Sequence, residues 1–183
     1  MIAFTRRTAL VLAAFTFLTT ALAATAGNAD PADGTASGTL TVNGKTTQVA
    51  YAYARSVPGF FDKSTQDTQV IVSDVPLDAT ALSDPFVRGD LADAGKLHAF
   101  EITIDVSGTP ISTAWRDNGF KGPQPSGLSS ADVFHLRQGF GGQVTKTVLD
   151  GKVVEGSYKS AAPAEFFGNT YAFDVTFRAV VAR

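Results

Sequence analysis

The sequence predicts an all-β, mostly antiparallel domain, either a β-sandwich or a flattened barrel, with a short helical insertion. Asn-Gly in VNGK (42–45) and Asp-Gly in LDGK (149–152) stand between strand-like runs, a pattern typical of tight hairpins because both central residues need positive φ. Apolar and polar residues alternate along 97–106 and 170–181, as in antiparallel strands with one buried and one solvated face. The alternative architecture is a closed up-and-down β-barrel.

The amino terminus has the features of a secretory signal peptide, which we expect to be residues 1–23. Arg6 and Arg7 precede an uncharged, mostly apolar run, and residues 21–23 have the small-x-small form of a cleavage site. The run is too short and too weakly apolar for a membrane span, so we expect no stable membrane anchor after cleavage. The sequence therefore predicts export to the periplasm or the medium, with the Sec and twin-arginine routes both open.

The rest of the chain is expected to form a flexible lead-in at residues 24–36 and a single β-rich domain at 37–183. The lead-in, ATAGNADPADGTA, consists of small and polar residues. About 160 residues remain after cleavage, which is enough for one complete hydrophobic core. The sequence has no cysteine, which excludes disulfides, thiolate metal sites and a cysteine nucleophile.

Strand-like runs follow one another along this domain, separated by turn residues. Counting both arms of each hairpin, we expect about eight or nine strands. Besides the hairpin arms, the runs are residues 48–55, 68–73, 97–106, 111–116, 132–138 and 170–181. Within 97–106, His98 and Phe100 belong to the apolar face, whereas Glu101 belongs to the face expected to meet water.

Residues 78–94 interrupt the strand pattern and form the expected helical insertion. Their helical spacing is weak, Pro85 breaks it, and Gly95 suits the end of a helix. We expect one or two short helical turns that lie over a sheet edge or a barrel end.

Four segments together resemble a group of small exported bacterial proteins of unassigned activity. The segments are VNGK, VSDVPL, AGKLHAFEITID and EFFGNTYAFDVTF, and the resemblance extends over nearly the whole mature chain. It implies export and a single β-rich domain. Because these motifs are hairpins and amphipathic strands, the resemblance implies no functional residue.

The charge balance argues against nucleic acid as a partner. The sequence contains 15 Lys and Arg and 17 Asp and Glu, and loss of Arg6 and Arg7 leaves a net charge near −4. Phosphate binding needs concentrated basic residues, and the sequence has no such cluster.

Residue types common in catalysis and metal binding are scarce. There are two histidines: His98 is expected in the core with a backbone carbonyl as its partner, and His135 is expected to face solvent or a groove. They are weak metal candidates, because nothing in their spacing brings them together with a carboxylate. The sequence therefore predicts no metal, no other cofactor and no assigned catalytic residue, and it contains no G-x-S-x-G motif.

A long link, residues 116–132, carries the first group of candidate contacts for a ligand or partner. Trp115 lies at its root, followed by Arg116 and by Phe120 within the link. Long segments without regular structure are often functional in compact domains. The structural alternative is a mobile loop with Trp115 in the core.

Two phenylalanine pairs in predicted turns form the second group: Phe60 with Phe61, and Phe166 with Phe167. We expect these rings to fold inward and cap the open ends of the sheet, which would contribute about 1.5–3 kcal/mol per buried ring. Alternatively, they surround the mouth of an apolar cavity.

The leading functional hypothesis is an exported, non-enzymatic binding module that recognises an apolar small ligand or an envelope protein through its aromatic loops. A cell-envelope hydrolase that uses carboxylates with His98 or His135 is the first alternative. The second is an inhibitor or immunity-type protein that blocks its partner with the link at 116–132.

Overall fold

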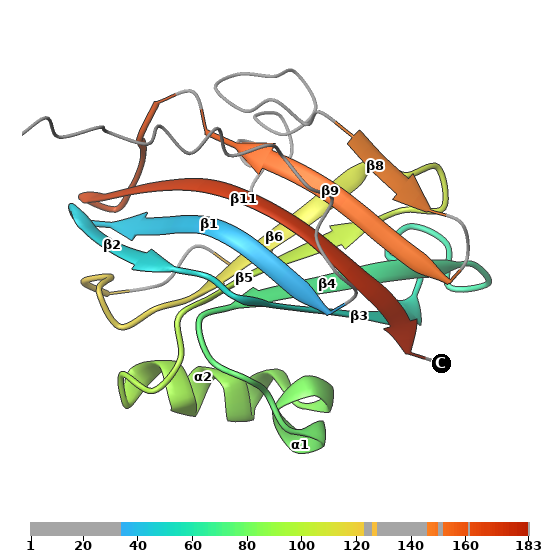
Figure 1. The fold of residues 1–183 in the computed structure, drawn as a ribbon, viewed down its shortest axis with the longest axis horizontal. Helices are drawn as coiled ribbons and strands as arrows, with labels where there is room; N and C mark the ends of the chain where they lie inside the picture. Colours follow the sequence, from blue (N-terminus) through green and yellow to red (C-terminus); the bar gives the residue numbers. More distant parts are fainter. Residues whose placement is uncertain (1–33, 123–125, 128–145, 150–151, 161, 183) are drawn as a thin grey trace, which may run out of the picture.

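The computed structural model describes residues 34–122, 126–127, 146–149, 152–160 and 162–182, and it confirms an all-β fold with a short helical insertion (Figure 1). All described strands belong to one sheet. They are β1 (Thr35–Val42), β2 (Lys45–Gln48), β3 (Tyr51–Pro58), β4 (Gln66–Ser73), β5 (Ala99–Ile104), β6 (Pro110–Arg116), β7 (Ser126–Gly127), β8 (Lys146–Leu149), β9 (Val153–Lys159), β10 (Ala164–Phe166) and β11 (Asn169–Ala182). The helices are α1 (Ala79–Ser83) and α2 (Pro85–Asp93).

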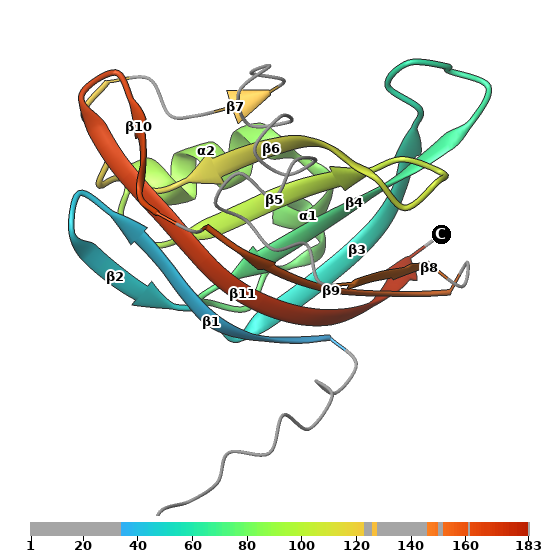
Figure 2. The ribbon, with the colours of Figure 1, turned by 90° about the horizontal axis from the view of Figure 1, so that it is seen from above.

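The sheet runs in the order β7-β6-β5-β4-β3-β1-β11-β9-β8 and curls over on itself (Figure 2). Its pairs are antiparallel, except that the end of β11 lies parallel to β3, with Val181 opposite Ala54. Phe100 of β5 stacks on Phe173 of β11 with 4.8 Å between ring centroids, although these strands are not neighbours in the sheet. The curled sheet has the form of a flattened barrel. This barrel is open, because no pairing among the described strands joins β8 to β6 or β7.

The hairpin predicted from Asn-Gly is present between β1 and β2. Asn43 and Gly44 have φ values of 49° and 80°, which is the positive region that this turn requires. β8 and β9 also pair antiparallel, whereas the residues of their turn, 150–151, lie outside the described part of the chain. The strand predicted at 132–138 lies outside it as well.

Strand β1 begins earlier than the sequence suggested. Thr35 and Ala36 fall within the predicted lead-in, yet they pair with Arg178 and Phe177 of β11. The small and polar residues of this stretch did not indicate a strand. The pairing with β11 is made by backbone hydrogen bonds, which depend little on the type of side chain.

The helical insertion covers the outer face of the sheet, and not a sheet edge or barrel end as predicted (Figure 1). Asp78 and Asp84 cap the two helices, and Pro85 begins α2 at a position where no backbone N–H is needed. Ala81 of α1 packs with Ile71 of β4 in a small apolar cluster. This arrangement corrects the expectation for residues 97–106, because the face predicted to meet water is buried under the helices.

The main core lies inside the curled sheet. It contains buried side chains from β1, β3, β4, β5, β6, β9 and β11. Trp115, with 1% of its surface exposed, contacts the rings of Phe120 at 5.8 Å and Tyr171 at 5.3 Å between centroids. Large aromatic side chains thus fill the space between the two walls of the sheet.

Candidate functional site

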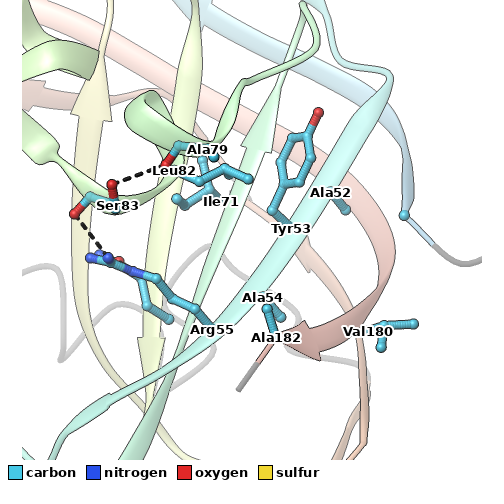
Figure 3. Close-up of a pocket in the computed structure, with 12 residues that line it drawn as sticks. Ala52, Tyr53, Ala54, Arg55, Ile71, Ala79, Leu82, Ser83, Val180 and Ala182 are labelled. Carbon is cyan, nitrogen blue, oxygen red and sulfur yellow. Dashed lines mark hydrogen bonds between the residues drawn. The ribbon is translucent and has the colours of Figure 1, made fainter.

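An apolar pocket of about 450 Å³ lies on the outer face of the sheet, beside α1 (Figure 3). Small-molecule sites in proteins are concave, mostly apolar and about 300–1,000 Å³ in volume, so this pocket falls within their range. Its lining residues are Gly34, Ala52, Tyr53, Ala54, Arg55, Gln69, Ile71, Ala79, Leu82, Ser83, Val180 and Ala182.

The pocket is formed by segments that are distant in the sequence: the paired strands β3 and β4, α1 and the end of β11, together with Gly34. Tyr53 and Arg55 lie two residues apart on β3 and therefore share one face of the sheet. Leu82 comes from α1, which packs on this face. The parallel pairing of β11 with β3 brings Val180 and Ala182 to the opposite side of the hollow, and Val180 keeps 51% of its surface exposed.

The pocket has one cationic edge, formed by Arg55. Its Nε donates to Oε1 of Gln69 at 2.7 Å, and its Nη1 donates to the backbone carbonyl of Ser83 at 3.0 Å. Figure 3 shows the guanidinium directed toward Ser83, while the ring of Tyr53 lies toward the other end of the pocket. The phenolic oxygen of Tyr53 accepts a hydrogen bond from the backbone N–H of Leu77.

A buried carboxylate lies behind this edge. Glu101 accepts hydrogen bonds from Nε of Arg88 and Nε of Arg116, both at 2.8 Å, and from Nε2 of Gln69 at 3.2 Å. Arg88 is fully buried, and its Nη1 also donates to the carbonyls of Ala81 and Leu82 in α1. These contacts fasten both helices to β5.

The two shifted pKa values in this group follow from burial and neighbouring charge. Burial raises the pKa of Glu101, but hydrogen bonds and positive charge from Arg88, followed by Arg116, outweigh it and hold that pKa below its ordinary value. The pKa of Arg55 is lowered by burial and then by the positive charge of Arg88, which Glu101 partly opposes. The site thus combines an apolar hollow with a guanidinium that is partly removed from water.

The structure places the residues predicted around the long link mainly in the core. Trp115 and Phe120 are buried against Tyr171, so neither ring is available to a ligand or partner. Arg116 points to the outer face and contacts Glu101. The burial of Trp115 agrees with the structural alternative for this link, in which that ring belongs to the core.

The predicted inward capping by the phenylalanine pairs is wrong for three of the four rings. Phe61 and Phe167 are 74% and 77% exposed, and Phe60 is also exposed, whereas Phe166 packs partly against the main core. Both hairpins extend beyond the body of the sheet, at opposite ends of the molecule (Figure 2). Within each pair the rings therefore contact each other edge to face, with centroids 5.1 Å and 4.8 Å apart.

His98 is buried as predicted, but its partner is a carboxylate and not a backbone carbonyl. Its Nδ1 lies 2.8 Å from Oδ2 of Asp117. Such a pair can orient an imidazole for proton transfer, yet both side chains are largely buried and no described hydroxyl is hydrogen-bonded to Nε2 of His98. His135 lies outside the described residues, which contain no group of three potential metal ligands.

Sequence reasoning missed the pocket residues. One signal was available in the sequence of β11. Val180 and Ala182 lie on the same face of this strand as Asp174 and Arg178, so two apolar residues occupy a face that was expected to meet water. Apolar residues on an outward face indicate a contact with something other than solvent. The alternation pattern alone does not show that α1 and β3 border the same surface.

Neither helix in the described part of the chain is long and apolar enough to cross a membrane. Comparisons with protein-family models, with curated proteins and with solved structures found no match for this chain.

Proposed function

We propose that this protein is an exported binding module that holds a small, largely apolar molecule in the pocket between α1, β3 and the end of β11. The pocket itself is the observation that carries the proposal: about 450 Å³ of apolar hollow, open beside the exposed side chain of Val180. The aromatic residues on which the sequence hypothesis relied lie elsewhere in the molecule. The proposal therefore keeps the function class and moves the ligand contacts to Tyr53, Ile71 and Leu82.

Burial of apolar ligand surface supplies the affinity in such a site. Each buried CH₂ group contributes about 0.8 kcal/mol, so a ligand that fills a modest part of this volume gains several kcal/mol before its losses of freedom are counted. The sheet below the pocket is continuously hydrogen-bonded, from β4 through β3 to β11, which provides a preformed floor. A preformed site lowers the entropic cost of binding.

Titration with the neutral apolar dye N-phenylnaphthylamine tests the proposal. The wild-type protein should enhance dye fluorescence saturably, and A79W, which places an indole in the pocket, should weaken binding at least tenfold. Ala94 is exposed at the end of α2 and does not line the pocket, so A94W is the matched control and should bind as the wild type does. Absence of dye binding, or equal binding by A79W, would contradict the proposal.

A second candidate function, recognition of a partner protein, is supported by the exposed aromatic tip of the β3–β4 hairpin. Phe60 and Phe61 project there with Lys63, whose Nζ lies 5.8 Å from the centroid of the Phe60 ring. A photocrosslinking residue at position 61 should give a defined protein adduct in the native envelope. The same residue at the exposed Phe86 of α2 is the control, and identical adduct patterns at both positions would count against a specific surface.

The hydrolase and inhibitor hypotheses remain predictions. The buried pair of His98 and Asp117 lacks a described nucleophile, and most of the link at 116–132 lies outside the described residues.

A further inference from the structure

Arg55 is fixed in place but not saturated with hydrogen bonds. Gln69 and the Ser83 carbonyl accept from Nε and Nη1, which sets the plane of the guanidinium at the edge of the pocket. Within the described part of the chain, Nη2 of Arg55 has no hydrogen-bond partner. A guanidinium held on one side presents its remaining N–H groups in a fixed direction, which suits planar acceptors such as carboxylates.

No carboxylate among the described residues pairs with Arg55. Glu101 supplies the carboxylate of this hydrogen-bonded cluster, but its acceptor positions are already occupied. Its Oε1 accepts from Arg88 and Arg116, and its Oε2 accepts from Arg88 and Gln69. A carboxylate has about four acceptor positions, so none remains for Arg55.

Gln69 connects Arg55 to the carboxylate of Glu101, but its neutral amide does not compensate the positive charge of Arg55. The amide oxygen accepts from Arg55 and the amide nitrogen donates to Glu101, which is the only orientation that satisfies both contacts. Burial and then the positive charge of Arg88 lower the pKa of Arg55, and the charge of Glu101 raises it without cancelling them, so the guanidinium lacks full compensation. A negative group at the pocket edge would provide it.

We infer that the ligand is an amphiphile with an anionic head group, which pairs with Arg55 while its apolar part lies against Tyr53, Ile71 and Leu82. This inference rests on the proposed function, because it assigns a ligand class to the same pocket. The head group would lie at the Ser83 side and the apolar part would extend toward Tyr53 and Val180. Figure 3 shows the Arg55 guanidinium at the Ser83 side of the pocket and these two lining residues on the other side. Carboxylate is the simplest head group that fits a single guanidinium.

Calorimetric titration with decanoate and decanol at neutral pH distinguishes binding of an apolar chain from recognition of an anionic head group. The two probes have the same alkyl chain and differ only in the head group. Hydrogen bonds between charged groups are stronger than those between neutral groups, so decanoate should bind wild-type protein at least tenfold more tightly than decanol. R55Q should reduce this preference to near unity, and R55K, which keeps the charge, should retain part of it. Thermal melting of both variants establishes that they are folded. K159Q removes an exposed cation outside the pocket and should keep the wild-type preference.

Equal affinities for the two probes in the wild type would overturn the inference and leave the proposed pocket intact. A preference for decanoate that survives R55Q would also overturn it, because the anion would then bind elsewhere. If neither probe binds the wild type, the proposed function itself fails. A decanoate preference that is lost in R55Q and partly kept in R55K supports the inference.

Discussion

Glu101 lies on the face of β5 that the alternation pattern assigned to water, yet only 3% of its surface is exposed. Two arginines from different elements, Arg88 of α2 and Arg116 of β6, converge on its carboxylate. Breaking a buried ion pair by removing one partner costs about 3–5 kcal/mol, because the other charge remains buried. The residue therefore controls how firmly the insertion is attached to the sheet.

Replacement of Glu101 by glutamine should destabilise the protein by about 3–5 kcal/mol at pH 7, because Arg88 and Arg116 then lose their counter-charge. The free energy of unfolding in urea measures this loss. D174N is the matched control: Asp174 forms an exposed pair with Lys159, which should contribute less than about 1 kcal/mol. A loss in E101Q as small as that in D174N would contradict this account of the buried cluster.

The same carboxylate predicts a loss of stability in acid. Its pKa in the folded state is lowered, so its contribution is fully present above the unfolded value of about 4.3 and disappears as pH falls through the folded value. Urea midpoints measured from pH 7 down to pH 3 should therefore fall more steeply below about pH 4.3 in the wild type than in E101Q. Parallel profiles for the two proteins would show that Glu101 is not the group responsible.

At the scale of single elements, strand β9 contains a glycine, Gly156, although glycine has a low propensity for strands. Gly156 lies opposite Phe177 of β11, and a Cβ atom there would come within 2.6 Å of that ring and 2.7 Å of the Tyr158 ring. The two rings stack over the backbone at 5.5 Å between centroids. The absence of a side chain thus creates the space that the aromatic stack occupies.

Substitution G156A should therefore destabilise the protein by about 1–3 kcal/mol, because the added methyl group overpacks the core. The matched control is G89A, in α2, where a Cβ atom would meet nothing within 4 Å. There, alanine should stabilise the helix by about 0.5–1 kcal/mol. Thermal unfolding of both variants measures the two effects, and changes of the same sign would argue against the proposed packing role of Gly156.

At the scale of the whole molecule, the sheet is held in its curled form by rings that meet across the core. Phe100 of β5 stacks on Phe173 of β11. Trp115 of β6 contacts Tyr171, also of β11. These contacts join strands that share no backbone hydrogen bonds, so they determine how far the sheet closes.

A double-mutant cycle between F100L and F173L should give a coupling energy of about 0.5–1.5 kcal/mol, the range found for aromatic pairs. Unfolding is conveniently followed by fluorescence, because Trp115 is the only tryptophan in the sequence and lies beside both rings. A cycle between F60L and F173L provides the control. Phe60 lies on the projecting hairpin, so its effect should add to that of F173L, and comparable coupling in both cycles would exclude a specific contact across the core.

The sequence by itself determined the features that depend on neighbouring residues. Alternation with period two defines the two faces of β5 and β11, and Asn43-Gly44 defines a turn, because positive φ is a local requirement. The sequence could not show that the Asn43 amide also donates to the Gly119 carbonyl and to Asn169. Those partners are distant along the chain and become neighbours only after folding.

Only the tertiary structure decided what each face meets. A helical insertion covers the outer face of β5, which is why Glu101 is buried, while two hairpins project far enough to leave Phe61 and Phe167 in solvent. The pocket requires α1, β3 and the end of β11 together, and no local pattern encodes their adjacency. Burial and binding depend on contacts between segments distant in sequence, whereas alternation and turn residues report only on the chain's immediate neighbours.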